Sequence, residues 1–415
     1  MLGLLLNRLM RKGVLTVIHS DGKAESFGQG TPHVTVRFHD KRAIPELLLN
    51  PDLALGELYM DGRLTVEEGG TVRDLLDLMM MNLGAVHPSG LHKLVRHFRR
   101  LTRRFAQFNP ASKSKEHVAH HYDLDGRLYD LFLDRDKQYS CAYFSAPGET
   151  LEEAQIGKKR HIAAKLHLDK PGLKVLDIGC GWGGLALDLA RDARAKVLGV
   201  TLSEEQIGIA KSRAAQAKLE ENCRFELVDY RALGGKYDRI VSVGMFEHVG
   251  APYYDAFFAK VRDLLADDGV MVLHNIGRVD GPGSTNSWIA KYIFPGGYVP
   301  ALSEMMTSIE RSGLMIADVE VLRLHYAQTL LEWSKRFQAN RARAAQIYDE
   351  RFCRMWEFYL AGAEMAFRHD GQVVFQLQLI KKVDALPITR DYMLEDERTM
   401  RFAGTESMPA PLRVV

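Results

Sequence analysis

Cysteine is scarce in this sequence, and long apolar runs are missing from it. The 415 residues include four cysteines and no CxxC pair, so the sequence indicates neither a zinc site nor a disulfide framework. No apolar run approaches the roughly 18 residues that a membrane-spanning helix needs, and mean hydropathy is -0.18. The apolar start at residues 1–6 is too short for a signal peptide. We therefore expect a cytoplasmic protein.

The composition excludes two further classes of protein. With 46% hydrophobic and 26% charged residues, the chain is neither wholly disordered nor a fibrous repeat. Net charge is only +2, yet residues 1–115 hold 17 Lys and Arg against 11 Asp and Glu, and the remainder is acidic. A basic front end on an acidic body predicts an anionic partner for the front end.

The first 90 residues predict a small α/β domain. Leu4, Leu5, Leu9 and Met10 indicate a short apolar helix. Residues 14–19 and 33–38 are typical of strands, and residues 43–49 and 72–80 of helices. Nothing in this segment indicates chemistry by itself.

A basic amphipathic helix is predicted over 91–105, followed by a linker at 109–115. Six apolar residues recur there at helical spacing, and six lysines and arginines fill the other positions, including Arg99, Arg100, Arg103 and Arg104. Three interpretations compete: a strut between domains, a nucleic-acid face, and a helix that binds an anionic membrane surface.

Regular alternation of strand-like and helical segments begins near residue 116 and predicts a doubly wound, mostly parallel sheet. The expected strands are 175–178, 196–200, 224–228, 239–243 and 270–274, with helices such as 151–166, 185–192 and 204–218 between them. Residues 319–325 and 373–379 could complete the sheet as a late, hairpin-like edge around a helical stretch at 330–367. Residues 383–415 are expected to form a loosely attached tail.

A glycine-rich turn follows the first of these strands. Gly179 and Gly181 would let a ligand approach the backbone, as in sites for NAD, FAD and S-adenosylmethionine (SAM). Asp177 inside the strand and the extra helix before it favour SAM. The next strand ends in Thr201 and Gln206, which are neutral polar groups, and Tyr230 after the third strand offers a stacking face for adenine.

Several runs together resemble one family, the cyclopropane fatty acid synthases, which include the mycolic acid cyclopropane synthases. Each motif is weak alone, but nine in the same order across 116–382 are specific. They are His121–Leu124, Leu131–Asp134, Tyr139–Phe144, Leu176–Gly184, Thr201–Gln206, Phe246–Gly250, His274–Gly277, Tyr292–Pro300 and His325–Leu330. The resemblance implies a Rossmann-like class I SAM-dependent methyltransferase fold, preceded here by the small N-terminal domain.

The resemblance also implies a site for a bicarbonate ion that acts as a base. Its ligand positions correspond to Cys141, Glu247, His274, the backbone of Ile276, and Tyr326. Tyr139 and Ser140 join the predicted SAM-binding residues in the same way. Ordinary structural roles compete for each: Glu247 could cap a helix, His274 could be a satisfied core histidine, and Cys141 a small buried residue.

The implied reaction is SAM-dependent cyclopropanation of unsaturated phospholipid acyl chains, at the inner face of a membrane to which the protein binds peripherally. Methyl transfer to the alkene leaves a carbocation, and loss of a proton closes the ring. A methylene- or methyl-branched product from the same site stays open, as does a non-catalytic lipid-binding protein. Nucleic-acid methylation is disfavoured because FEHVG stands where a base-pocket motif would be. A homodimer is one option for the oligomeric state.

Overall fold

The computed structural model describes residues 2–67, 69–83 and 125–400. The predicted basic helix at 91–105, the linker and the motif at 121–124 lie outside the described residues.

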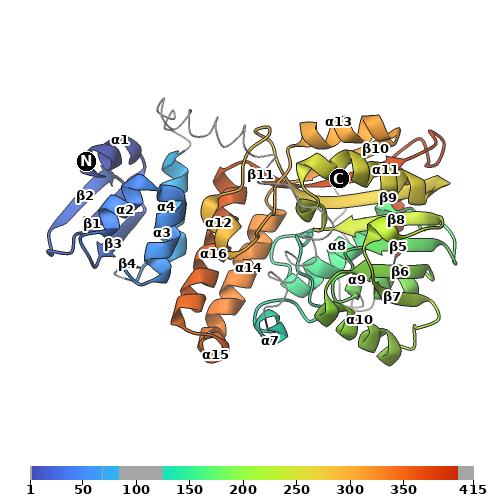
Figure 1. Ribbon diagram of the computed structural model, residues 1–415, viewed down its shortest axis with the longest axis horizontal. Helices are drawn as coiled ribbons and strands as arrows, with labels where there is room; N and C mark the ends of the chain where they lie inside the picture. Colours follow the sequence, from blue (N-terminus) through green and yellow to red (C-terminus); the bar gives the residue numbers. More distant parts are fainter. Residues whose placement is uncertain (1, 68, 84–124, 401–415) are drawn as a thin grey trace.

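The N-terminal unit is a four-stranded sheet covered by helices, at one end of the molecule in Figure 1. The sheet order is β2 (Ala24–Gln29), β1 (Gly13–Ile18), β3 (His33–Phe38), β4 (Leu64–Val66), with β1 and β3 parallel. The helices are α1 (Leu2–Leu9), α2 (Ala43–Leu49), α3 (Pro51–Met60) and α4 (Val72–Leu83). The expected small α/β arrangement is thus present, with β2, β4 and α3 in addition to the elements that the sequence predicted.

A seven-stranded sheet forms the centre of the larger unit. Its order is β10 (Met315–Leu322), β11 (Gln372–Ile380), β9 (Leu265–Arg278), β8 (Tyr237–Val243), β5 (Lys174–Ile178), β6 (Lys196–Thr201), β7 (Cys223–Leu227). The strands from β9 to β7 run parallel, and β11 is antiparallel to both of its neighbours. The predicted doubly wound, mostly parallel sheet and its late antiparallel edge are therefore confirmed.

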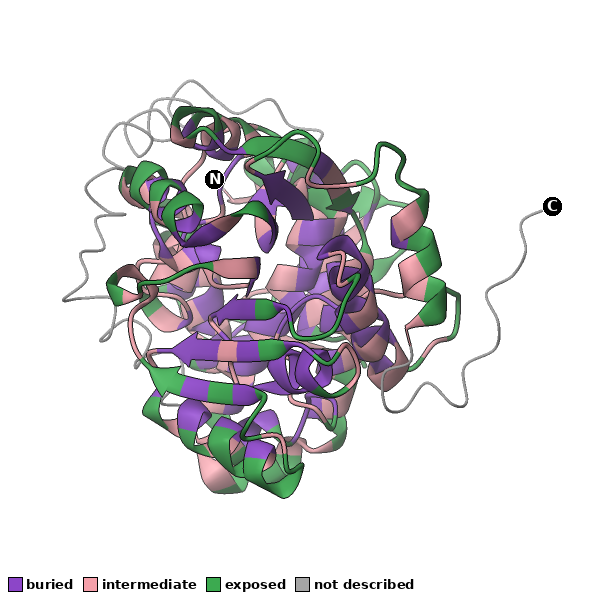
Figure 2. Cartoon of the chain, turned by 90° about the vertical axis from the view of Figure 1, so that its right-hand side faces the viewer, coloured by how far each residue is buried: buried purple, intermediate pink, exposed green. Residues whose placement is uncertain are grey.

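Helices cover both faces of this sheet, whose inner strands are largely buried (Figure 2). One buried cluster joins it to α8 (Leu151–Lys165), α9 (Gly184–Arg191) and α10 (Glu204–Gln216). Another joins it to α11 (Tyr254–Leu264) and α13 (Leu302–Ser312). Short helices α7 (Gly126–Tyr129) and α12 (Ser287–Tyr292) lie in the connections.

Three helices stand between β10 and β11, where the sequence predicted one helical stretch at 330–367. They are α14 (His325–Ala339), α15 (Arg341–Ile347) and α16 (Glu350–His369). Asp349 begins α16 by accepting a hydrogen bond from the amide of Phe352, which explains the break before that helix. The expected strand at 319–325 ends earlier than predicted, at Leu322, because His325 already belongs to α14.

The N-terminal unit packs through α3 and α4 on α16 of this insertion, and through α3 also on α12 (Figure 1). Arg73 of α4 makes two hydrogen bonds of 2.8 Å to Glu364 of α16, a carboxylate with 0% side-chain exposure. A Cβ atom on Gly56 would lie 2.4 Å from the indole nitrogen of Trp288, so this close approach of α3 to α12 requires glycine.

The prediction of a loosely attached tail is wrong for residues 391–399. They form α17 (Asp391–Thr399), which packs on α8. Glu397 lies 3.0 Å from Nδ1 of His161, and Tyr392 accepts a 2.6 Å hydrogen bond from Gln378. The helix is therefore part of the folded unit.

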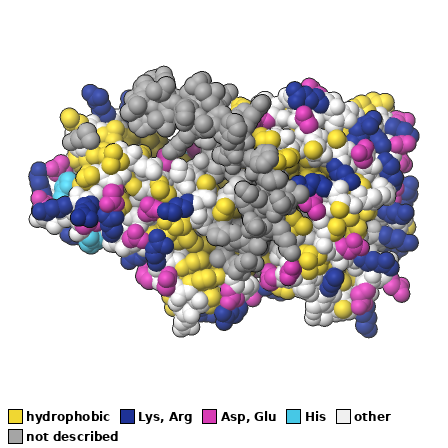
Figure 3. Space-filling model, in the orientation of Figure 1, with side chains coloured by type: hydrophobic (Ala, Val, Ile, Leu, Met, Phe, Trp, Pro, Cys, Tyr) yellow, Lys and Arg dark blue, Asp and Glu magenta, His cyan; other side chains and the backbone are white. Residues whose placement is uncertain are grey.

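No described helix is both long and apolar enough to cross a bilayer. On the face drawn in Figure 3, basic and acidic side chains are interspersed over the described surface.

Candidate active site

The glycine-rich turn joins β5 to α9 and borders a cavity. Gly179 (φ +85°) and Gly181 (φ +53°) both occupy the left-handed region. A Cβ on Gly179 would come within 2.8 Å of Met245, whereas one on Gly181 would meet no atom within 4 Å and would enter the space beside the turn. This geometry leaves the backbone open to a ligand, as a SAM-binding turn requires.

The structure brings five of the eight predicted cofactor residues to this cavity: Gly179, Gly181, Thr201, Gln206 and Tyr230. Thr201 Oγ1 and Gln206 Oε1 are 3.1 Å apart, so the end of β6 and the start of α10 present linked polar groups. The Tyr230 ring packs edge-on against Phe257, with centroids 5.5 Å apart, which fixes its orientation at the cavity wall.

Sequence reasoning missed several residues of the cavity wall, among them Arg231, Met245, His248 and Tyr253. His248 is part of the FEHVG motif, so the motif offered a signal for it. Arg231 forms an ion pair with Asp229 and lies over the Tyr230 ring, with its guanidinium carbon 5.7 Å from the ring centroid.

Asp177, Tyr139 and Ser140 lie outside the residues that line the cavity. Burial raises the pKa of Asp177 to about 7. The hydroxyls of Tyr139 and Tyr359 are 3.0 Å apart, and the Tyr139 ring stacks on Trp333. The Ser140 hydroxyl accepts a 2.8 Å hydrogen bond from Lys158.

Glu247 follows β8 and contacts β9 directly. Its Oε1 accepts a 2.6 Å hydrogen bond from the amide of Ile276, so two predicted ligand positions touch. Burial raises the pKa of Glu247 to about 7, against the effect of the Ile276 amide. Oε2 is buried and has no hydrogen-bond partner among the described residues, which leaves a polar atom available to a ligand.

His274 lies on β9 beside Val243, the last residue of β8. It was expected at a strand end, but β9 continues to Arg278 because β11 pairs with it along that length. Gln376 donates a 3.1 Å hydrogen bond to His274 Nδ1, so a neutral ring carries its proton on Nε2. Burial is the main cause that lowers the pKa of His274 well below its usual value.

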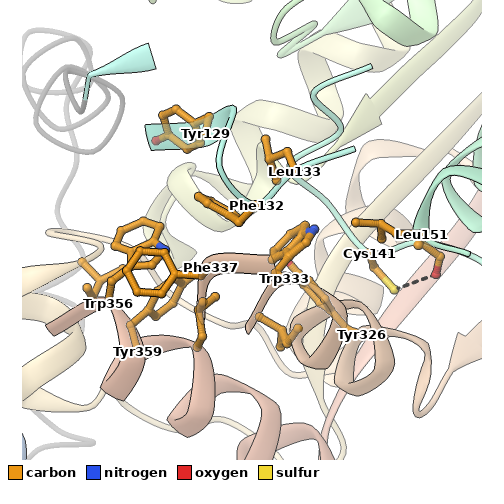
Figure 4. Packing of buried hydrophobic residues seen from close by; sticks show 14 of the residues in the cluster. Tyr129, Phe132, Leu133, Cys141, Leu151, Tyr326, Trp333, Phe337, Trp356 and Tyr359 are labelled. Atoms are coloured by element: carbon orange, nitrogen blue, oxygen red, sulfur yellow. Dashed lines mark hydrogen bonds between the residues drawn. The ribbon is translucent and has the colours of Figure 1, made fainter. Parts of the chain in front are cut away.

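Cys141 and Tyr326 belong to one buried cluster rich in aromatic rings (Figure 4). Trp333 lies between Phe132 and Tyr326, with ring centroids 5.9 and 5.8 Å from it. The Cys141 thiol donates a 3.3 Å hydrogen bond to the Ala142 carbonyl, and burial raises its pKa. Ile276 packs against the same cluster. Four of the five predicted ligand positions are therefore connected. Glu247 is bonded to Ile276, and Ile276 packs against the cluster that contains Cys141 and Tyr326.

These residues suit an anion or a polar ligand beside an apolar core. No group of three metal-binding side chains occurs within the described ranges.

Comparisons with known proteins agree with this geometry. The family model for mycolic acid cyclopropane synthetase matches residues 110–377, and a model for a domain of unknown function matches residues 4–87. The chain is 39% identical to the cyclopropane-fatty-acyl-phospholipid synthase of Escherichia coli, over 86% of this chain and 90% of the relative. It is 41% identical to a probable fatty acid methyltransferase of Pseudomonas putida, over 67% of this chain and 73% of the relative.

The fold is similar to that of the mycolic acid cyclopropane synthase CmaA1 in complex with SAH and CTAB. That match has a TM-score of 0.61 and 35% identity, and it covers 66% of this chain and 99% of the other. The resemblance and the class I methyltransferase fold inferred from the motifs are confirmed. The chain belongs to the mycolic acid cyclopropane synthetase family of SAM-dependent methyltransferases.

Proposed function

We propose that this enzyme transfers a one-carbon unit from SAM to the cis double bond of an unsaturated acyl chain in a membrane phospholipid, forming a cyclopropane ring. The observation that carries the proposal is the buried aromatic cluster around Cys141 and Tyr326, next to the SAM-type turn. Apolar surroundings suit an acyl chain and exclude the water that would quench a carbocation on it.

The cavity at the glycine turn supports SAM as the methyl donor. Gly179 and Gly181 would allow its close approach, while Thr201, Gln206 and Tyr230 would contact its polar and aromatic parts. We assign Tyr139, Ser140 and Asp177 to the same cofactor as well. These residues belong to segments next to the cavity and do not line it. When bound, SAM supplies an electrophilic sulfonium methyl group.

Cys141, Glu247, His274, Ile276 and Tyr326 are assigned to a bicarbonate ion. The unpartnered Oε2 of Glu247 supports this assignment, because a carboxyl group with a pKa of about 7 is partly protonated at neutral pH and can then donate to an anion. A neutral His274 donates through Nε2. When bound, bicarbonate supplies the base that takes up the proton released as the ring closes.

We assign membrane attachment to the N-terminal part of the chain. Residues 1–90 would form a lipid-binding domain, 91–115 a basic helix and linker, 116–382 the catalytic domain and 383–415 a C-terminal segment. The six basic residues of the predicted helix would give several kcal/mol of attraction to anionic lipids before salt screening, at about 1 kcal/mol each. The enzyme then acts from the cytoplasmic side, peripherally bound to the inner face of the membrane.

The test is mass spectrometry of phospholipid vesicles after incubation with the purified protein and SAM. A 14-dalton gain confined to lipids with unsaturated chains is expected, with none on saturated controls. Fragmentation separates a ring from a methyl or methylene branch, the alternative product that the same carbocation could give. A protein that binds SAM yet adds no mass to unsaturated chains would contradict the proposal.

A further inference from the structure

Lys158 is a buried lysine of α8 whose charge has no carboxylate partner within ion-pair distance among the described residues. Its side chain is almost fully enclosed, with 1% exposure. The ammonium donates to Gln138 Oε1 at 2.5 Å and to Ser140 Oγ at 2.8 Å, both neutral acceptors. A buried ammonium without a direct ion-pair partner is costly, so its presence calls for an explanation.

The next residue along the helix provides a contrast. Lys159 is also buried, but its ammonium forms ion pairs with Asp136 at 2.7 Å and Asp188 at 2.5 Å. Lys159 is therefore directly ion-paired within the protein, whereas Lys158 is not.

Lys158 is bonded to the segment that contains two predicted site residues, Ser140 and Cys141. Gln155, one turn earlier on α8, donates to the Ser140 carbonyl at 3.0 Å. From the other side, Thr329 of α14 accepts a 3.0 Å hydrogen bond from the Ala142 amide. Ser140 and Cys141 are thus held between two helices, with the ammonium of Lys158 bonded to the first of them.

The charge of Lys158 also acts on the site beyond its hydrogen bonds. Burial is the main cause that shifts the pKa values of Cys141, Asp177 and His274, and the ammonium lowers all three. Asp134, Asp136 and Lys159 are the other charged groups that act on Lys158. Burial lowers the pKa of Lys158 to about 8, so it remains mostly charged at neutral pH.

We propose that Lys158 is a positioning residue that holds Ser140 and Cys141 in place and supplies the positive charge that favours an anion beside Cys141 and His274. The inference rests on the proposed function, because bicarbonate is the anion assigned to that place. Cys141 and His274 are themselves neutral, since burial disfavours the thiolate and the imidazolium. The bound anion would then give Lys158 a negative partner in addition to Asp134 and Asp136, which act on it without forming ion pairs.

The test is titration of the full-length protein with ¹³C-bicarbonate in the presence of saturating SAH and without lipid, followed by NMR. Lys158→Met is expected to weaken bicarbonate binding about tenfold or more, because it removes a nearby unit charge from a poorly screened site. SAH affinity, measured by calorimetry, should fall much less than bicarbonate affinity. Lys158 does not itself line the cofactor cavity and reaches the cofactor residues only through Ser140 and Asp177.

Lys159→Met is the matched control. It makes the same change at the adjacent buried position, but removes a charge already balanced by Asp136 and Asp188. It should lower thermal stability and leave bicarbonate affinity unchanged. If Lys158→Met does not fold, Lys158→Gln removes the charge while keeping a hydrogen-bond donor.

Selective loss of bicarbonate affinity supports the proposal. Unchanged bicarbonate affinity, an equal loss of SAH and bicarbonate affinity, or a wild-type protein that binds no bicarbonate would each overturn it. Because no lipid is present, these results are independent of whether phospholipids gain mass, and the two proposals can fail separately.

Discussion

The carboxylate of Glu247 and the main-chain amide of Ile276 are joined by a 2.6 Å hydrogen bond between the end of β8 and strand β9. Only one carboxylate oxygen is used. The other oxygen is buried without a partner among the described residues. Because the pKa of Glu247 is raised to about 7, the carboxyl group is partly protonated near neutral pH. The strand thus orients the carboxyl group while one oxygen stays available to a ligand.

Glu247→Gln is expected to reduce turnover by about 100-fold or more, because it removes the ionisable group from the anion site at nearly constant shape. SAH affinity should remain within about threefold of wild type, since Glu247 does not line the cofactor cavity. Initial rates on unsaturated vesicles and calorimetry with SAH measure the two effects.

Glu357→Gln is the control for that change. Glu357 is buried to a similar extent, but it binds Arg341 and Tyr59 at the contact with the N-terminal unit. It should alter stability more than turnover. Full activity of Glu247→Gln would remove this residue from the catalytic site.

Gly181→Val is expected to abolish SAH binding in a protein that still folds. The new side chain would enter the open space beside the turn, where the cofactor is assigned. Gly172→Val is the matched control, because Gly172 also has a positive φ with open space around it but precedes β5. Calorimetry with SAH compares them, and equal affinities in the two variants would contradict the assignment of the turn.

The sequence predicted the elements that position this site, because their signals are local. The β5 turn is marked by glycines that lie at positive φ. Glu247 follows β8 and His274 lies on β9, and these two strands pair in parallel. Resemblance then supplied the chemical roles, which no spacing could reveal.

Other features were unpredictable because they depend on pairing between distant residues. The edge strand β2 is largely exposed and polar, so it shows no clear alternation. The burial of Lys158 against Ser140 could not be predicted either. A helix as rich in charged residues as α8 is typical of an exposed surface, yet several of its charged side chains are buried by contacts with distant segments. Arg73 and Glu364 are 291 residues apart.

Arg73→Met is expected to destabilise the protein by about 1–3 kcal/mol, because the fully buried carboxylate of Glu364 loses the two hydrogen bonds that Arg73 donates to it. Arg368 remains bonded to that carboxylate and limits the loss. Urea unfolding measures the effect. Arg37→Met, at the more exposed pair with Glu67, should cost less than about 0.5 kcal/mol. Equal effects would show that the interdomain pair contributes no more than a surface pair.

Reversing Arg99, Arg100, Arg103 and Arg104 to glutamate is expected to weaken binding to anionic liposomes about tenfold or more, with the difference shrinking as salt rises. Liposome sedimentation at low and high salt measures it. The control reverses four exposed basic residues of the catalytic unit: Arg194, Lys211, Lys218 and Arg224. Undiminished binding by the first variant, or equal loss in both, would favour the interpretation of 91–105 as a strut.

Glu397→Gln tests whether α17 is held by the charge on His161. Burial lowers the pKa of His161, but its hydrogen bonds to Glu320 and Glu397 outweigh this effect and raise the pKa above 6.5. A histidine whose pKa is raised in the folded state stabilises the protein fully below the unfolded value, and this contribution is lost as pH rises through the folded value.

The Glu397→Gln variant should therefore be less stable than wild type by about 1 kcal/mol at pH 6, and the difference should shrink by pH 9. Urea unfolding at both values measures it. Glu395→Gln, at an exposed position of the same helix, controls for the loss of a negative charge. A deficit of equal size at pH 6 and pH 9 would mean that Glu397 holds the helix through a hydrogen bond independent of the imidazolium, since only the charged ring can make its contribution vary with pH in this range.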